Sequence, residues 1–253
     1  MDFLARILQE KQKEVAVMPL EERLPVTRRP NLYSKMQKST QQMQVIAEIK
    51  RASPSKGIIN QEVDIIKQAK TYEKAGAAAI SVLTDPVFFK GNIQDLRLIA
   101  KTVSLPILCK DFIISEKQLL RAKNAGASIV LLIVAALTEK QLYHLFEKAV
   151  VLELEVLVEV HNLEELRRAE KLGAYLIGVN NRNLMTFDVS IETSALLSPQ
   201  LSDRIYISES GFKSKTDVQQ VTARYQGILV GETLMCSEDV AEKMKELQVS
   251  RCG

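Results

Sequence analysis

Short apolar runs recur along the chain and alternate with longer amphipathic stretches. The runs are rich in β-branched residues and have the length of buried strands. Three of the amphipathic stretches end at Ala-Gly-Ala or Leu-Gly-Ala (residues 75–77, 125–127 and 172–174), and glycine in this place is typical of a helix end. The pattern predicts eight strands, at residues 45–50, 78–83, 106–109, 129–134, 156–160, 176–179, 204–208 and 227–230.

Strands that alternate with helices predict a parallel sheet built from βα units. Eight such units in 253 residues match a (β/α)8 barrel, the α/β fold known as the TIM barrel. A doubly wound open sheet is the alternative, but it normally carries a Gly-rich phosphate loop, and no GxGxxG or GxxxxGK[ST] motif occurs here. Residues 1–44 read as one helix followed by irregular chain with three prolines. We therefore expect one barrel domain over residues 1–253, with residues 1–44 as an N-terminal helical extension packed on the barrel.

Composition narrows the class of protein. Hydrophobic residues make up 46% and charged residues 26% of the chain, and the net charge of +3 is spread evenly, which favours a small anionic ligand over nucleic acid. The three cysteines form no CxxC pair, so neither a disulfide framework nor a zinc site is indicated, and we expect no bound metal. The N-terminus lacks a signal-type apolar core, and no apolar run is long enough to span a membrane. We expect a cytoplasmic protein, and a monomer.

Polar side chains gather where the predicted strands end. Glu48 and Lys50 lie two residues apart at the end of the first strand, so both face the same side of the sheet. In a barrel the carboxyl ends of the strands form the active site, and acids and ammonium groups crowded there shift one another's pKa values. The alternative to an active site is that these polar residues are ordinary rim residues exposed to water. Their recurrence at the same end of several strands favours an active site. The later strand ends contribute Lys110, Glu159, Asn180, Glu209, Ser210 and Gly231.

Two glycine-containing loops, residues 208–212 and 230–234, follow the last two strands, where barrels commonly hold a phosphate; tight turns are the alternative reading. Phe89 and Phe112 either wall a pocket for an aromatic ligand or serve ordinary packing. His161, just after the fifth strand, reads as a helix-start or rim residue and not as a catalyst.

The motifs at these strand ends resemble those of the indole-3-glycerol-phosphate synthase family. The resemblance rests on residues 46–55 (IAEIKRASPS), 110–113 (KDFI), 158–161 (VEVH), 178–184 (GVNNRNL), 208–211 (SESG) and 230–235 (VGETLM). It implies a (β/α)8 carboxy-lyase of tryptophan biosynthesis that needs no cofactor. The implied substrate is 1-(2-carboxyphenylamino)-1-deoxyribulose 5-phosphate, whose indole ring is closed with loss of CO2 and water.

The resemblance also implies roles for individual residues. Lys110 is the acid for ring closure, and Glu159 stabilises the cationic intermediate or transfers a proton. Glu48 and Lys50 catalyse the dehydration and bind the substrate carboxylate. Asn180 and Glu209 orient the sugar hydroxyls or the amine. The resemblance leaves open how Lys50 and Lys110 divide the acid role. The implied substrate and phosphate contacts are Ser53, Phe89, Phe112, Leu131, Arg182, Leu184, Ser210, Gly211, Gly231 and Glu232.

Two other functions stay open at the level of sequence. A Schiff-base aldolase would use Lys110 or Lys50 as its nucleophile. A phosphate-binding barrel without catalysis would share the same fold. The presence of acids and lysines together at the strand ends argues against the second of these.

Overall fold

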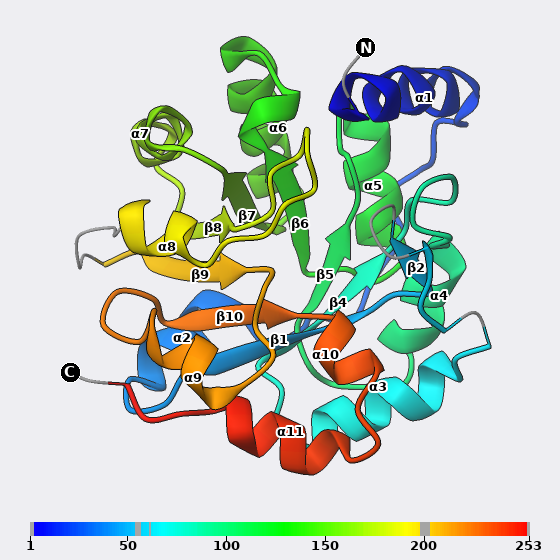
Figure 1. Cartoon of the computed structure of the whole chain (residues 1–253). Helices are drawn as coiled ribbons and strands as arrows, with labels where there is room; N and C mark the ends of the chain where they lie inside the picture. The colour runs from blue at the N-terminus through cyan, green and yellow to red at the C-terminus, as the bar shows by residue number, and fades with distance from the viewer. Residues whose placement is uncertain (1–2, 54–56, 61, 198–202, 252–253) are drawn as a thin grey trace.

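Eight parallel strands close into a barrel, as the alternation of strands and helices predicts (Figure 1). The computed structural model describes residues 3–53, 57–60, 62–197 and 203–251. The neighbours around the barrel run in the order β1-β10-β9-β8-β7-β6-β5-β4. The strands are β1 (Gln44–Ile49), β4 (Ala79–Leu83), β5 (Ile107–Lys110), β6 (Ile129–Ile133), β7 (Glu155–Val160), β8 (Leu176–Asn180), β9 (Ile205–Glu209) and β10 (Gly227–Val230).

Each strand begins and ends within one or two residues of its predicted range. The structure adds a two-stranded antiparallel sheet that the sequence pattern did not predict, β2 (Ala52–Ser53) paired with β3 (Gly57–Ile58). This hairpin directly follows β1, and residues 54–56 of the family-like motif between its strands lie outside the described residues. Such short strands carry too few residues to show a period in the sequence.

Alternation along the strands separates two apolar cores. Side chains that point inward fill the barrel below its mouth, and those that point outward pack against the helices. On β5, for example, Leu108 belongs to the inner core and Ile107 and Cys109 belong to the outer one. Members of the inner core include Ile46, Leu108, Leu131, Leu157, Ile207 and Leu229.

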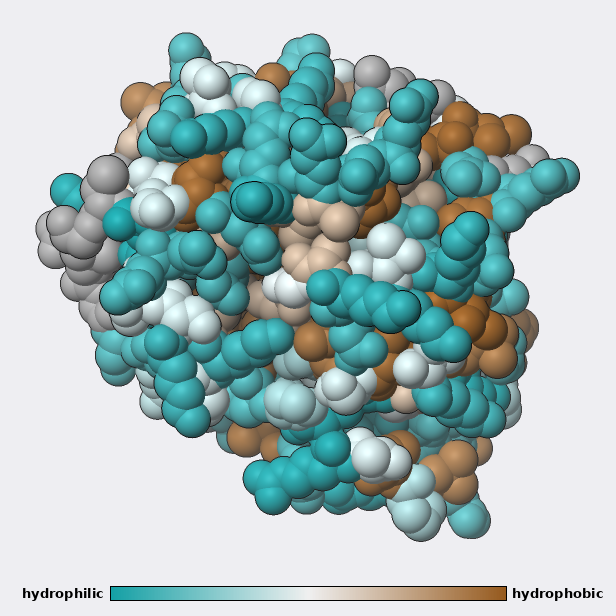
Figure 2. Space-filling model, turned by 90° about the horizontal axis from the view of Figure 1, so that it is seen from below, coloured by the Kyte–Doolittle hydropathy of each residue, from teal (hydrophilic) through white to brown (hydrophobic). Residues whose placement is uncertain are grey.

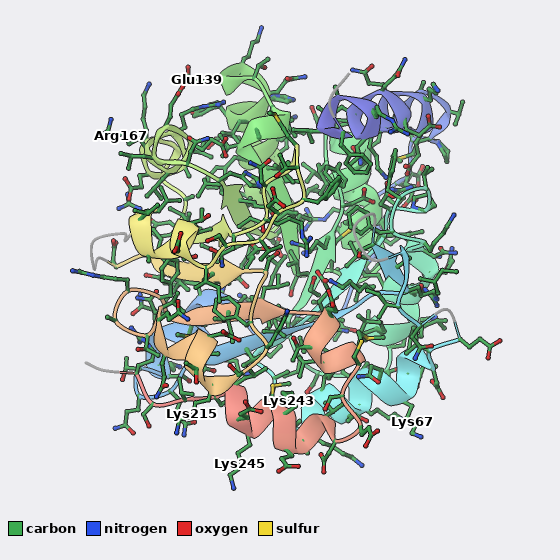
Figure 3. All side chains as sticks on the ribbon, in the orientation of Figure 1. Lys67, Glu139, Arg167, Lys215, Lys243 and Lys245 are labelled. Atoms are coloured by element: carbon green, nitrogen blue, oxygen red, sulfur yellow. The ribbon has the colours of Figure 1, made fainter. Side chains whose placement is uncertain are left out.

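Helices surround the barrel and present charged side chains outward. Figure 2 shows one outer face that is mostly hydrophilic, and the side chains labelled in Figure 3 lie on the outer helices. None of the helices in the described ranges is long and apolar enough to cross a membrane. The helices after β1 are α3 (Ile65–Lys74), α4 (Ile93–Ala100), α5 (Glu116–Asn124), the 3-10 helix η1 (Val134–Ala136), α6 (Glu139–Val151), α7 (Leu163–Leu172), α8 (Glu192–Leu197), α9 (Lys215–Gln219), α10 (Glu232–Met235) and α11 (Val240–Leu247).

The N-terminal extension contains two helices, α1 (Phe3–Val17) and α2 (Leu32–Lys38), so the prediction of one helix followed by irregular chain was wrong for α2. Leu32 and Met36 of α2 are fully buried and belong to the inner barrel core. The carboxylate of Glu155, at the start of β7, accepts hydrogen bonds from the backbone N–H groups of Leu32 (2.7 Å) and Tyr33 (2.9 Å). The helix therefore depends on tertiary contacts that a seven-residue pattern does not reveal.

A buried lysine attaches α1 to the barrel. Lys11 is 1% exposed, and its Nζ lies 2.9 Å from Asp85 Oδ2, 2.7 Å from Asp111 Oδ1 and 2.6 Å from Glu14 Oε2. Burial lowers the pKa of Lys11, but the two aspartates outweigh this effect and raise it above the ordinary value. Asp85 and Asp111 follow β4 and β5, so the ion cluster holds α1 against the ends of two neighbouring strands, beside α5 in Figure 1.

Replacing Lys11 by methionine will destabilise the protein. The substitution keeps the length of the side chain but leaves Asp85 and Asp111 buried without their cation, which typically costs about 3–5 kcal/mol. We expect urea unfolding to show a loss of this order. The matched control is Lys13→Met on the same helix, where the side chain is 65% exposed and a change within about 0.5 kcal/mol is expected. Equal unfolding curves for the two variants would contradict the role given to the cluster.

Candidate active site

One cavity of about 850 Å³ opens at the carboxyl ends of the strands, and all sixteen candidate catalytic and substrate-binding residues predicted from the sequence line it. The six polar residues are Glu48, Lys50, Lys110, Glu159, Asn180 and Glu209. The other ten are Ser53, Phe89, Phe112, Leu131, Arg182, Leu184, Ser210, Gly211, Gly231 and Glu232. A cavity of this size is in the range that holds a small organic ligand.

Four of the polar side chains form one layer of the barrel interior. They come from alternate strands, which is how (β/α)8 barrels fill each interior layer. Below this layer the same strands contribute only apolar side chains to the inner core. The charged layer therefore forms the floor of the cavity. Its members are Glu48 on β1, Lys110 on β5, Glu159 on β7 and Glu209 on β9.

Lys110 lies between two buried carboxylates. Its Nζ is 2.7 Å from Glu209 Oε2 and 3.4 Å from Glu159 Oε2, and both glutamates are almost fully buried. Burial lowers the pKa of Lys110, but the attraction of Glu209 and Glu159 outweighs it and raises the pKa well above the ordinary value. Lys110 is thus held as an ammonium at neutral pH.

The two glutamates respond differently to the same ammonium. Burial raises the pKa of Glu159, but Lys110 and His161 overcome this effect and bring the pKa down to about 2. For Glu209, burial and the nearby Glu159 charge dominate over Lys110 and raise the pKa to about 7. Two carboxylates beside one cation commonly separate in this way. The site therefore holds one carboxylate that stays ionised, Glu159, and one that titrates near neutral pH, Glu209.

One oxygen of Glu209 packs against the backbone of β8. Among the described residues, Glu209 Oε1 is buried and has no hydrogen-bond partner. It lies against Gly178 on β8, where a Cβ atom would come within 2.1 Å of it. Gly178 therefore makes room for the Glu209 carboxylate.

Glu48 and Lys50 form a second ion pair on the same floor. The Nζ of Lys50 is 3.0 Å from Glu48 Oε1, and alternation along β1 brings both side chains inward, as the sequence predicts. Both pack against Gly231, where β10 ends. A Cβ on Gly231 would lie 2.4 Å from Glu48 Oε1 and 2.9 Å from Lys50 Nζ. The close packing explains why this position has no side chain.

The loop after β9 is fixed by amide side chains from β8. Ser210 Oγ donates a hydrogen bond to Asn180 Oδ1 (3.0 Å), and Asn181 Nδ2 donates one to the backbone oxygen of Ser210 (3.0 Å). Ser210 and Gly211 both have positive φ, at 70° and 98°, so the chain turns sharply at the edge of the cavity. Asn181 itself is buried in a network with Ser194 and Ser208.

Apolar side chains form the opposite wall of the cavity. The rings of Phe89 and Phe112 have centroids 6.1 Å apart, and Leu131 and Leu184 line the same cavity. Phe112 and Leu131 belong to the inner core cluster, and Phe89 and Leu184 pack against it. This wall provides a slot of the size and character that an aromatic ring would occupy.

Several cavity residues were not predicted from the sequence, among them residues 186–192, which follow β8. Others come from α1, where Phe3, Leu4 and Ile7 line the cavity, although the extension was expected only to pack on the barrel. Phe3 contacts Phe88 and Phe187 edge to face, with centroids 5.3 and 4.6 Å away. The apolar spacing at positions 3, 4 and 7 was the available signal, but it indicates only a buried helix face.

His161 is not among the residues that line the cavity. It lies at a helix start, as predicted, directly before Asn162, the N-cap of α7, and its ring is mostly buried and contacts Glu159. No group of three or more His, Cys, Asp and Glu side chains in the described part of the chain could hold a metal ion.

The fold and the site together define a (β/α)8-barrel enzyme whose acids and lysines face an apolar slot. Residues 4–247 match the model of the indole-3-glycerol phosphate synthase family. The chain therefore belongs to the indole-3-glycerol phosphate synthase family. A relative of that name from Listeria monocytogenes serovar 1/2a is 56% identical over 99% of this chain and 100% of its own length. Another, from Streptococcus gordonii, is 55% identical over 99% of this chain and 98% of its own length.

Solved structures with low sequence identity share the fold. A thiamine phosphate pyrophosphorylase from Pyrococcus furiosus superimposes with a TM-score of 0.60 at 19% identity, covering 86% of this chain and 96% of its own. A 3-hexulose-6-phosphate synthase gives a TM-score of 0.63 at 14% identity, covering 81% and 98%. At these identities the likeness supports the barrel fold alone.

Replacing Gly231 by alanine will disturb the Glu48–Lys50 pair. The backbone at Gly231 has a negative φ of −116°, so alanine meets no positive-φ penalty there, and the expected effect of the new Cβ is to displace one of the two charged groups. A displacement of about 1 Å in an active site can reduce the rate by about 100-fold, so we expect kcat/KM to fall by about 10-fold to 100-fold. Steady-state kinetics and thermal unfolding measure the two effects separately. Unchanged kinetics with an unchanged melting temperature would contradict the packing described for this position.

Proposed function

We propose that the chain closes the indole ring of 1-(2-carboxyphenylamino)-1-deoxyribulose 5-phosphate, with loss of CO2 and water, through the side chains on the floor of its cavity. The family assignment supports this carboxy-lyase activity in tryptophan biosynthesis. The observation that carries the residue assignment is the position of the Lys110 ammonium between two buried carboxylates, beside an apolar slot.

Ring closure needs an acid at the sugar carbonyl. The ring carbon that bears the carboxylate attacks the ketone carbon, and the ketone oxygen must take up a proton as the bond forms. Lys110 is the proposed donor, because its ammonium is fixed on the floor of the cavity. The attack leaves positive charge on the aromatic amine, and the Glu159 carboxylate is the proposed stabilising anion.

Two further bonds then break. Loss of CO2 from the ring carbon that made the new bond restores the aromatic ring. The new hydroxyl then leaves as water when an acid protonates it and a base removes a proton from the neighbouring carbon. Glu48 and Lys50 are the proposed base and acid for this dehydration, and Lys50 also suits the substrate carboxylate. Asn180 and Glu209 are proposed to orient the sugar hydroxyls or the amine.

The remaining residues are proposed to bind the ends of the substrate. Phe89, Phe112, Leu131 and Leu184 would hold the anthranilate ring in the apolar slot. The phosphate would lie at the loops after β9 and β10, where the turn at Ser210 and Gly211 and the close approach of the backbone at Gly231 favour an anion. The proposed phosphate region comprises Ser53, Arg182, Ser210, Gly211, Gly231 and Glu232.

The charge state of Lys110 favours acid catalysis over Schiff-base chemistry at this residue. A lysine nucleophile must lose its proton before it can attack a carbonyl, and such lysines have lowered pKa values. The pKa of Lys110 is raised, because two carboxylates stabilise the ammonium despite its burial. A Schiff-base aldolase that uses Lys110 is therefore disfavoured.

We also propose that one chain forms a complete site and acts as a monomer. All the proposed residues come from this chain, and the buried Lys11 cluster makes the extension part of one domain with the barrel. A cytoplasmic location is proposed because Cys109 and Cys236 are free thiols, which a reducing compartment preserves.

Replacing Lys110 by alanine will lower kcat by about 100-fold or more, the effect typical of losing a positioned acid. The assay follows the fluorescence of the indole product as it forms from the carboxyphenylamino sugar phosphate. The control is Lys101→Ala, at the exposed end of α4, which should leave the rate unchanged. A rate for Lys110→Ala within twofold of the control would remove Lys110 from the mechanism.

The rate will depend on a group with a pKa near 7. Glu209 accepts a hydrogen bond from Lys110 that is strongest when Glu209 is ionised, and burial together with the Glu159 charge raises the pKa of Glu209 to about 7. We therefore expect kcat/KM to rise with pH up to about 7 and then to level off. The variant Glu209→Gln should lose this inflection while keeping the limb that belongs to the substrate phosphate, near pH 6. An identical profile in the variant would exclude Glu209 as the titrating group.

A further inference from the structure

His161 contacts carboxylates through both of its ring nitrogens. Its Nε2 lies 3.2 Å from Glu159 Oε1, and its Nδ1 lies 3.0 Å from Glu165 Oε2 on α7. The backbone N–H of His161 also donates to Glu165 Oε2, at 2.8 Å. The ring is 13% exposed, so these contacts are largely shielded from water. The sequence places His161 two residues after Glu159, which brings both side chains to the same side of β7.

Among the described residues Nδ1 is hydrogen-bonded to Glu165, whereas Nε2 has no aligned hydrogen-bond partner, so its 3.2 Å contact with Glu159 Oε1 is electrostatic and favours a charged ring. A neutral imidazole has one N–H donor, whereas the imidazolium has two. Burial lowers the pKa of His161, but Glu159 and Glu165 outweigh it and raise the pKa to about 10. Glu159 and Glu165 are the acidic groups that face the ring among the described residues, from β7 and α7 respectively.

The two oxygens of Glu159 have different partners. Oε1 faces His161, and Oε2 faces Lys110 at 3.4 Å. Asn180, from the next strand, also helps to lower the pKa of this carboxylate. A carboxylate held on one side by a cation cannot rotate freely or take up a proton easily. The orientation of Glu159 toward the cavity therefore depends on His161 as well as on Lys110.

We propose that His161 is a positioning residue for the ring-closure reaction: its imidazolium, anchored by Glu165, keeps Glu159 ionised and aimed at Lys110 and the bound amine. The proposal rests on the proposed function, because it assigns a second support to the carboxylate that stabilises the cationic intermediate. His161 itself acts through Glu159 and touches no reacting atom.

The charge on His161 can be measured without any activity assay. The chain has two histidines, and His144 lies exposed on α6 beside Glu116, away from the cavity. In a His144→Gln variant the only imidazole signals belong to His161, and catalysis should be unchanged. Nitrogen-15 NMR at pH 8 should show both ring nitrogens protonated. In the further variant Glu165→Gln the ring should lose its proton at a lower pH. A neutral ring at pH 8 with Glu165 in place would overturn the proposal.

Kinetics test the consequence for Glu159. In His161→Leu, kcat should fall about tenfold, the loss expected for one charge-assisted contact at a reacting group, while KM should change less than about twofold. An added loss of kcat should appear at acidic pH, below the inflection that Glu209 gives near pH 7, because Glu159 loses a cation and binds a proton more easily. His161→Gln keeps one donor and should recover part of kcat.

The kinetic outcomes separate positioning from general structural support. A change confined to KM, no added loss of kcat at acidic pH, or equal losses in His161→Leu and His161→Gln would overturn the proposal. If the wild-type chain formed no indole, the proposed function would fail, while the NMR measurement would still decide the charge of His161.

Discussion

One ammonium group holds two buried carboxylates together at the centre of the barrel mouth. Glu159 and Glu209 both contact the Nζ of Lys110, and in a largely buried site two like charges of this kind could not both ionise without a cation between them. The two acids nevertheless differ in pKa. Glu159 has a second positive neighbour, His161, whereas Glu209 has no second cation to offset its burial. One acid stays charged over the physiological range and the other changes its charge within it.

The barrel supplies the geometry that this arrangement needs. Alternate strands send their side chains into the same layer, so residues far apart in sequence meet without any loop having to position them. The layer below is apolar and tightly packed, so it fixes the strand ends and excludes water from the underside of the charges. It includes Leu108, Leu157 and Ile207, each two residues before a charged member of the layer above.

The sequence alone predicted the strands and the floor of the cavity, because both follow from the two-residue period of a strand. The eight runs and the inward direction of Lys110 needed only alternation and the rule that barrel sites lie at the strand ends. The helix α2 was missed because it is stabilised by Glu155, whose position is set by the fold. The contact of His161 with Glu165 was missed for a similar reason, because Glu165 reaches it from α7. Contacts between elements leave no period in the sequence.

The end of β5 connects the extension to the chemistry. Three consecutive residues there face three directions: Lys110 enters the charged floor, Asp111 binds the buried Lys11 of α1, and Phe112 lines the apolar slot. The peptide units between them are stiff, so a shift of α1 that moves Asp111 must also move the proposed proton donor and one wall of the slot. Because Lys11 also binds Asp85, the helix is fixed to two strands and cannot tilt without breaking a buried ion pair. The extension is therefore a structural support of the site as well as part of its wall.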